Sequence, residues 1–217
     1  ASAATELAQS IANRLRSGIQ QRGHAVLAVS GGSSPKLLFK ELANIDLPWS
    51  YVTVTQVDER WVEPDHADSN ARLIREHLLL NRAAAARFAP MRNPAPTPEA
   101  GQQKCEEMLR NLPSPFHAIV LGMGEDGHTA SLFRGAANLC NALDIRRDEL
   151  CTFMHPLHAP HPRMTLTLRA LAHYLVGDYA GAKAPLELAV PAGYQVERPL
   201  LAASAQALLT PIALAGH

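Results

Sequence analysis

The first thirty residues change from a helical hydrophobic pattern to a strand pattern. Large aliphatic residues recur at every fourth position, at Leu7, Ile11, Leu15 and Ile19, which is typical of an amphipathic helix. The run that follows, residues 25–30, is almost entirely apolar and ends at a pair of glycines. Such a run predicts a short strand that is buried on both faces.

The rest of the chain alternates between strand and helix patterns. β-Branched residues predict a second strand over 51–57, and an apolar segment predicts a third over 117–121. Further strand candidates are 151–155, 164–168 and 175–176. Helices are expected over 35–42, from an N-cap within 68–70 through Leu80, over 99–112 and over 182–189.

This alternation indicates the fold class. Strands that alternate with helices favour an α/β fold with a mostly parallel sheet flanked by helices. The proline-rich segment 89–98 is expected to be a surface loop, because the alternation resumes after it. We therefore expect a single domain over residues 1–217. Ligands of such sheets bind at the carboxyl ends of the strands, so the loops after residues 30, 57 and 121 are the places to search.

Composition and charge narrow the possible partners. Lysine plus arginine and aspartate plus glutamate number 20 each, so the formal net charge is zero, and a nucleic-acid surface is not expected. No apolar run reaches the roughly 20 residues that a membrane helix needs. Charged residues interrupt the N-terminus, so it is not expected to be a signal peptide. Three widely spaced cysteines fit a reducing cytoplasm better than a disulfide framework.

The loop after the first strand could bind a phosphate group. It reads Ser30-Gly31-Gly32-Ser33-Ser34-Pro35 and leads into a predicted helix. Glycines allow the backbone to approach a ligand closely, and a helix N-terminus offers free N–H groups to an anion. The hydroxyls of Ser33 and Ser34 would add donors. The alternative is an ordinary turn in which a serine caps the helix.

The loop after the second strand carries Asp58, Glu59 and Arg60. Two acids and a base at the carboxyl end of a strand can form a salt-bridged turn or part of a catalytic site. This stretch does not decide between the two interpretations.

The third loop, residues 122–129, reads Gly-Met-Gly-Glu-Asp-Gly-His-Thr. It matches the Gly-x-Gly-x-x-Gly pattern of dinucleotide sites, but it follows the third strand and lacks the expected acidic strand end about 20 residues later. Asp126 lies two residues before His128, and a carboxylate can orient an imidazole that acts as a base. The alternative is that Asp126 and Thr129 cap a helix.

A metal site is not expected. Cys151, His155, His158 and His161 form a local cluster among prolines, but their spacing matches no standard zinc site. A polar loop is the preferred interpretation.

Taken together, the three loops resemble the 6-phosphogluconolactonase family, which is related to the glucosamine-6-phosphate deaminases. Order and spacing agree from about residue 25 to residue 170. The matching segments are Ser30–Pro35, Asp58–Arg60 followed by His66, Ser69 and Asn70, Gly122–Phe133, and Pro162–Thr167. The deaminases typically have a tyrosine where Arg60 stands and a different continuation after His128, so both differences favour the lactonase. The resemblance implies the Rossmann-like fold of sugar-phosphate isomerases and lactonases.

The resemblance also implies roles for individual residues in hydrolysis of 6-phospho-D-glucono-1,5-lactone, a reaction that needs no metal or organic cofactor. His128 would be the general base and Asp126 would orient it. Arg60 or backbone N–H groups would stabilise the oxyanion, and Asp58 would bind sugar hydroxyls or order Arg60. The substrate phosphate would be bound by the residues Gly31, Gly32, Ser33, Ser34, Arg163 and Lys183. The alternatives are a deaminase or isomerase of sugar phosphates, and a non-catalytic module that binds them. The sequence does not indicate an oligomeric state.

Overall fold

The computed structural model describes residues 2–114, 116–122, 128–133, 135–136, 138–144 and 146–154, and the backbone of 165–168. The α-helices in these ranges are α1 (Ala3–Arg22), α2 (Lys36–Asn44), α3 (Asn70–His77), α4 (Pro98–Arg110) and α5 (Leu139–Leu143). The strands are β1 (Ala25–Val29), β2 (Val52–Gln56), β3 (Asp58–Arg60), β4 (Arg87–Phe88), β5 (Ala118–Val120), β6 (Cys151–Met154) and β7 (Thr165–Leu168). Short 3₁₀ helices are η1 (Trp49–Tyr51) and η2 (Asn81–Ala85).

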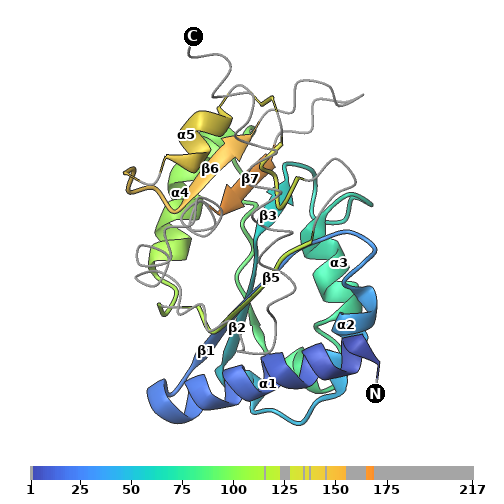
Figure 1. Ribbon diagram of the computed structural model, residues 1–217. Helices are drawn as coiled ribbons and strands as arrows, with labels where there is room; N and C mark the ends of the chain where they lie inside the picture. The colour runs from blue at the N-terminus through green and yellow to red at the C-terminus, as the bar shows by residue number, and fades with distance from the viewer. Residues whose placement is uncertain are drawn as a thin grey trace.

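A parallel sheet of order β4-β2-β1-β5 forms the centre of the described structure (Figure 1). Strand β1 pairs in parallel with β2 on one side and with β5 on the other, with Val29 opposite Gln56 and Val120. All five residues of β1 are buried, which explains its uninterrupted apolar sequence. The three strands expected over 25–30, 51–57 and 117–121 are therefore confirmed, and their carboxyl ends lie at one edge of the sheet.

Helices cover both faces of this sheet. Ala25, Leu27 and Val29 of β1 belong to a hydrophobic cluster with α1 and α2. The alternating residues Val26 and Ala28 belong to a second cluster with α4. Successive side chains of a strand point to opposite faces, so β1 supplies both cores. Figure 1 shows α4 on one side of the sheet and α2 and α3 on the other.

Local capping signals set the helix ends. Ser2 caps α1, which ends at Gly23 in the left-handed region. Ser69 is the N-cap of α3 and accepts a hydrogen bond from the Arg72 backbone N–H. Thr97 caps α4 ahead of Pro98. The prediction of an N-cap within 68–70 is thus confirmed, although α3 ends at His77 rather than Leu80.

A second sheet, of order β3-β7-β6, is antiparallel. Asp58–Arg60, which we expected to be a loop, forms β3 and pairs with β7, with Asp58 opposite Thr167. This correction has a simple cause: the partner strand lies about a hundred positions further along the chain, and three polar residues carry no local strand signal. The predicted strands over 151–155 and 164–168 are confirmed as β6 and β7.

Some predictions lie outside the described residues, namely the strand over 175–176 and the helix over 182–189. Across the ranges given above, no helix is both long enough and apolar enough to cross a membrane.

Candidate functional site

The three loops singled out from the sequence meet at the carboxyl edge of the parallel sheet. The Ser30 N–H donates to the Val120 carbonyl at 3.0 Å, and the Val57 N–H donates to the Val29 carbonyl at 3.0 Å. These bonds continue the sheet ladder past the ends of β1 and β2. The loops that begin at residues 30, 57 and 121 therefore leave the sheet side by side.

The first loop is exposed and uncapped. Gly32, Ser33 and Ser34 are exposed, and Gly32 has a φ of 91°, a conformation that favours glycine. The N-cap position of α2 is occupied by Pro35, and no side chain caps this helix. The alternative in which a serine caps the helix is therefore not what the structure shows. The two hydroxyls and the helix N-terminus are instead open to solvent, as an anion site requires.

Asp58 is buried between the second and third loops. Its Oδ2 accepts a hydrogen bond from the Ser131 hydroxyl at 2.7 Å, and its Oδ1 accepts one from Asn70 Nδ2 at 3.3 Å. Burial raises the pKa of the Asp58 carboxyl, against the lowering effects of the Ser131 hydrogen bond and of the charges on Arg60 and His128. Asp58 thus connects the two loops and lies within the field of both cationic candidates.

Arg60 is held by α3 and the segment before it. Its Nη1 donates to the Asp68 carbonyl at 2.9 Å and to Asn70 Oδ1 at 3.1 Å. Asn70 also lies directly against the first loop, since a Cβ added to Gly31 would come within 1.8 Å of Asn70 Oδ1. The side-chain amide of Asn70 therefore contacts Arg60, Asp58 and the first loop, which it meets at Gly31.

Glu59 has a structural role that the sequence did not separate from its neighbours. Its carboxylate is almost fully buried and accepts five hydrogen bonds: from Gln56 Nε2, the Ser69 hydroxyl and the backbone N–H groups of Arg60, Asn70 and Ala71. Burial raises its pKa, and the hydrogen bonds oppose that shift. Glu59 therefore binds the N-terminus of α3, whereas Asp58 and Arg60 hydrogen-bond to the Asn70 side chain.

The third loop carries His128, which is half-buried and lies with its ring centroid 4.9 Å from that of Phe133. Thr129 does not cap a helix, because its hydroxyl donates to the Gly122 carbonyl at 2.8 Å and closes the loop on itself. Ala130 follows with a φ of 48°. The loop is thereby folded so that the buried Ser131 reaches Asp58. Asp126, the predicted partner of His128, lies outside the described residues.

Two further predicted phosphate ligands, Arg163 and Lys183, also lie outside the described residues. The same holds for His155, His158 and His161, while Cys151 is a buried residue of β6. Within the described part of the chain, no group of three histidine, cysteine, aspartate or glutamate residues could hold a metal ion.

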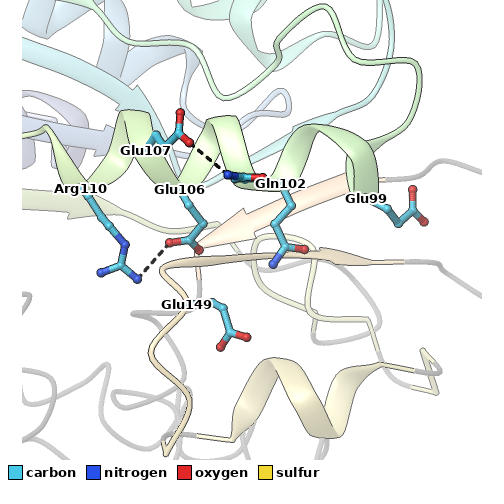
Figure 2. Close-up of a pocket in the computed structure, with 7 residues that line it drawn as sticks. Glu99, Gln102, Glu106, Glu107, Arg110 and Glu149 are labelled. Atoms are coloured by element: carbon cyan, nitrogen blue, oxygen red, sulfur yellow. Dashed lines mark hydrogen bonds and ion pairs between the residues drawn. The ribbon is translucent and has the colours of Figure 1, made fainter.

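A separate cavity of about 510 Å³ lies beside α4 and contains none of the predicted site residues (Figure 2). Its polar side chains support the fold. Glu106 accepts a hydrogen bond from the Cys151 N–H at 2.7 Å, and Gln102 donates to the Cys151 carbonyl at 3.2 Å. They tie α4 to Cys151, the first residue of β6.

Ser131 and Asn70 are residues to which sequence reasoning assigned no role in the site, since Asn70 was considered only as one of the N-cap candidates within 68–70. Both belong to the segments that match the 6-phosphogluconolactonase family, so the motifs could have indicated that these residues contribute to the site. A serine within a Gly-rich loop and an asparagine beside an N-cap are usually read as local capping residues, and here both hydrogen-bond across the site.

Comparison with known proteins identifies the family of this chain. The profile of the family described as glucosamine-6-phosphate isomerases/6-phosphogluconolactonase matches residues 1–174. A 6-phosphogluconolactonase of Pseudomonas aeruginosa is 45% identical over 166 residues, which are 76% of this chain and 70% of that protein. One of Rhizobium meliloti is 43% identical over 203 residues, 92% of this chain and 88% of that protein. The crystal structure of a 6-phosphogluconolactonase from Shewanella baltica has a TM-score of 0.74 at 47% identity and covers 78% of this chain and 71% of that one. The chain therefore belongs to the glucosamine-6-phosphate isomerase/6-phosphogluconolactonase family.

Proposed function

We propose that this protein hydrolyses 6-phospho-D-glucono-1,5-lactone to 6-phospho-D-gluconate, a step of the oxidative pentose phosphate pathway. The observation that carries the proposal is the meeting of three loops at one sheet edge. Gly31 lies against Asn70, Asn70 contacts Asp58 and Arg60, and the charge of His128 acts on Asp58. The relatives named 6-phosphogluconolactonase, 43–45% identical to this chain, support the same substrate.

The substrate phosphate would bind to the first loop. Gly31 and Gly32 allow close backbone approach, and the hydroxyls of Ser33 and Ser34 and the N-terminus of α2 supply donors. Arg163 and Lys183 would add positive charge from later in the chain. A guanidinium suits this role because its paired N–H groups match two phosphate oxygens.

The lactone carbonyl would lie near His128. As a general base, the imidazole takes a proton from the attacking water and then returns it to the departing ring oxygen. Asp126 would hold the ring in orientation. The tetrahedral intermediate is an oxyanion that needs donors aimed at it, which Arg60 or N–H groups of the third loop would provide. Asp58 orders Arg60 or binds sugar hydroxyls.

The remaining expectations belong to the same proposal. The enzyme would act as one α/β domain in the cytoplasm on a small sugar-phosphate lactone. Nucleic acid and membrane would have no part in the reaction. Lactone hydrolysis by general acid–base catalysis involves no oxidation or reduction, so it would need no redox cofactor.

The test is the rate of 6-phospho-D-glucono-1,5-lactone hydrolysis, corrected for the spontaneous reaction. Activity on this substrate, much lower activity on unphosphorylated glucono-1,5-lactone and no ammonia release from glucosamine 6-phosphate are the expected results. Arg163→Ala should weaken the preference for the phosphorylated lactone by raising its KM. Ammonia release without lactone hydrolysis would point to a deaminase, and phosphogluconate binding without any turnover would point to a binding module.

A further inference from the structure

Asn70 is buried at the junction of the three loops and is 1% exposed. Its side-chain amide makes three polar contacts. Oδ1 accepts from Arg60 Nη1 at 3.1 Å, and Nδ2 donates to the Asp58 carbonyl at 2.9 Å and to Asp58 Oδ1 at 3.3 Å. Both ends of the amide are therefore engaged with residues of the proposed site.

These partners permit only one orientation of the amide. A guanidinium only donates hydrogen bonds, whereas a carbonyl and a carboxylate only accept them. Rotating the amide by 180° would place NH₂ against Arg60 and the oxygen against Asp58, so every contact would become repulsive. The orientation of Asn70 consequently fixes the relative position of Asp58 and Arg60.

The backbone of Asn70 is equally fixed. Its N–H donates to Glu59 Oε1 at 2.8 Å, and the N–H of the next residue, Ala71, donates to Glu59 Oε2 at 2.8 Å. Asn70 is also the first residue of α3, directly after the N-cap Ser69. A side chain on a rigid helix N-terminus holds its neighbours more accurately than one on a free loop.

The contacts leave Arg60 able to act on a ligand. Among the described residues, the hydrogen bonds to the Arg60 side chain both use Nη1, from the Asp68 carbonyl and from Asn70. The Nε and Nη2 donors are then available for a developing oxyanion. Gly31 of the first loop lies against the same amide, because a Cβ at this position would come within 1.8 Å of Asn70 Oδ1.

We propose that Asn70 is a positioning residue that aims Arg60 at the oxyanion of the tetrahedral intermediate. The proposal rests on the proposed lactonase function for the reaction that it serves. It requires that Asn70 act through Arg60, which distinguishes it from a residue that only stabilises α3.

A double-mutant cycle tests this requirement, because residues that act through one another have non-additive effects. Asn70→Ala should lower kcat by about 10-fold or more, the effect of losing a charge-assisted hydrogen bond, and leave KM within about 3-fold. In an Arg60→Ala background the same change should alter kcat by less than about 2-fold. Equal factors in both backgrounds, or no effect with Arg60 present, would overturn the proposal.

Two further variants distinguish an effect of Asn70 on Arg60 from a loss of stability of α3. Ser69→Ala removes the α3 N-cap without touching Arg60 or Asp58, so it should lower stability while kcat stays within about 2-fold. Asn70→Asp keeps the shape and the Arg60 acceptor but adds a negative charge beside Asp58. It should retain more activity than Asn70→Ala and shift the acidic limb of the pH–rate profile to higher pH. If Asn70→Ala does not fold, the cycle is run with Asn70→Asp, and an unmoved pH profile or additive effects count against the proposal.

A failure of the proposed lactonase function can be distinguished from a failure of the proposed role of Asn70. Absence of lactone hydrolysis by the wild type would reject the lactonase assignment. The same cycle is then measured on the Kd for 6-phospho-D-gluconate, whose carboxylate carbon derives from the lactone carbonyl and would lie where the oxyanion forms. Non-additive losses of affinity would support the link between Asn70 and Arg60, and additive losses or no binding would reject it.

Discussion

The Ser131 hydroxyl donates a 2.7 Å hydrogen bond to Asp58 Oδ2, joining side chains that are 73 positions apart in the chain. Ser131 is completely buried and Asp58 is 5% exposed. The bond links the loop that carries His128 to the strand that carries Arg60. It favours the charged form of a carboxylate whose pKa burial raises.

Ser131→Ala should destabilise the protein by about 1–3 kcal/mol, because a buried carboxylate loses a hydrogen bond that nothing replaces. Urea unfolding gives the free energy. Ser17→Ala is a matched control, since Ser17 is exposed on α1 and alanine favours helices. Equal stabilities of the Ser131 and Ser17 variants would contradict the importance of this bond.

Asp58 should also make stability depend on pH. Its pKa is raised in the folded protein, so between the unfolded and folded pKa values the native state binds more protons than the unfolded state. The free energy of unfolding contributed by this group therefore falls as the pH rises through that window. Asp58→Asn replaces the titrating carboxyl with an amide that does not titrate. The Ser131 hydroxyl can rotate to accept a hydrogen bond from this amide, so the contact is kept. The stability of this variant relative to wild type should increase as the pH rises from the ordinary pKa of an aspartate, about 3.9, to the raised pKa of Asp58 in the folded protein, as followed by urea unfolding. A constant difference over that range would show that Asp58 does not titrate as its burial implies.

The parallel sheet could be predicted because its strands carry their signal locally. β1 is buried on both faces, so its sequence is a plain apolar run, and β2 is a series of β-branched residues. The meeting of Gly31, Asp58 and His128 followed from a general property of parallel sheets: the carboxyl ends of adjacent strands share one edge. No side-chain geometry was needed for that step.

The hydrogen-bond partners could not be predicted in the same way. Asp58, Glu59 and Arg60 are consecutive, yet Glu59 binds the α3 N-terminus while Asp58 and Arg60 contact Asn70. Alternation along a strand assigns neighbours to opposite sides, but this segment becomes a strand only by pairing with β7. The division of roles therefore depends on a long-range contact that a local pattern does not contain.

Gly31→Ala should abolish most of the activity. A Cβ at this position would lie 1.8 Å from Asn70 Oδ1, so the amide would have to move and release Arg60 and Asp58. We expect kcat/KM to fall by at least about 100-fold, as misplacement by about 1 Å can cause. Gly23→Ala is the control. It places a Cβ at a φ of 77° with open space around it, so it should cost about 1–2 kcal/mol of stability without loss of activity. Comparable kcat/KM for the two variants would argue against the contact between Gly31 and Asn70.

Glu59→Gln should destabilise the protein by about 2 kcal/mol or more. The carboxylate accepts five hydrogen bonds, and the substitution would turn one accepting oxygen into a donor that faces other donors. The control is Glu76→Gln: Glu76 lies on α3, the helix whose N-terminus Glu59 binds, but it is exposed and paired with Arg72 at the surface, so this change should alter stability little. Thermal and urea unfolding of both variants provide the comparison. A Glu59 variant as stable as the Glu76 variant would show that the α3 N-terminus does not depend on this carboxylate.

His128→Ala should lower the corrected rate of lactone hydrolysis by about 10²–10⁴-fold, the usual contribution of a positioned general base. Stability should change little, because the His128 side chain is only half-buried. His77→Ala, on α3 and outside the three loops, controls for the loss of an imidazole. The pH–rate profile adds a second measurement, since the wild-type limb that reports deprotonation of the base should disappear in the His128 variant while the His77 variant keeps it. A rate within a few-fold of wild type would remove His128 from the mechanism and leave activation of water to another group of the third loop.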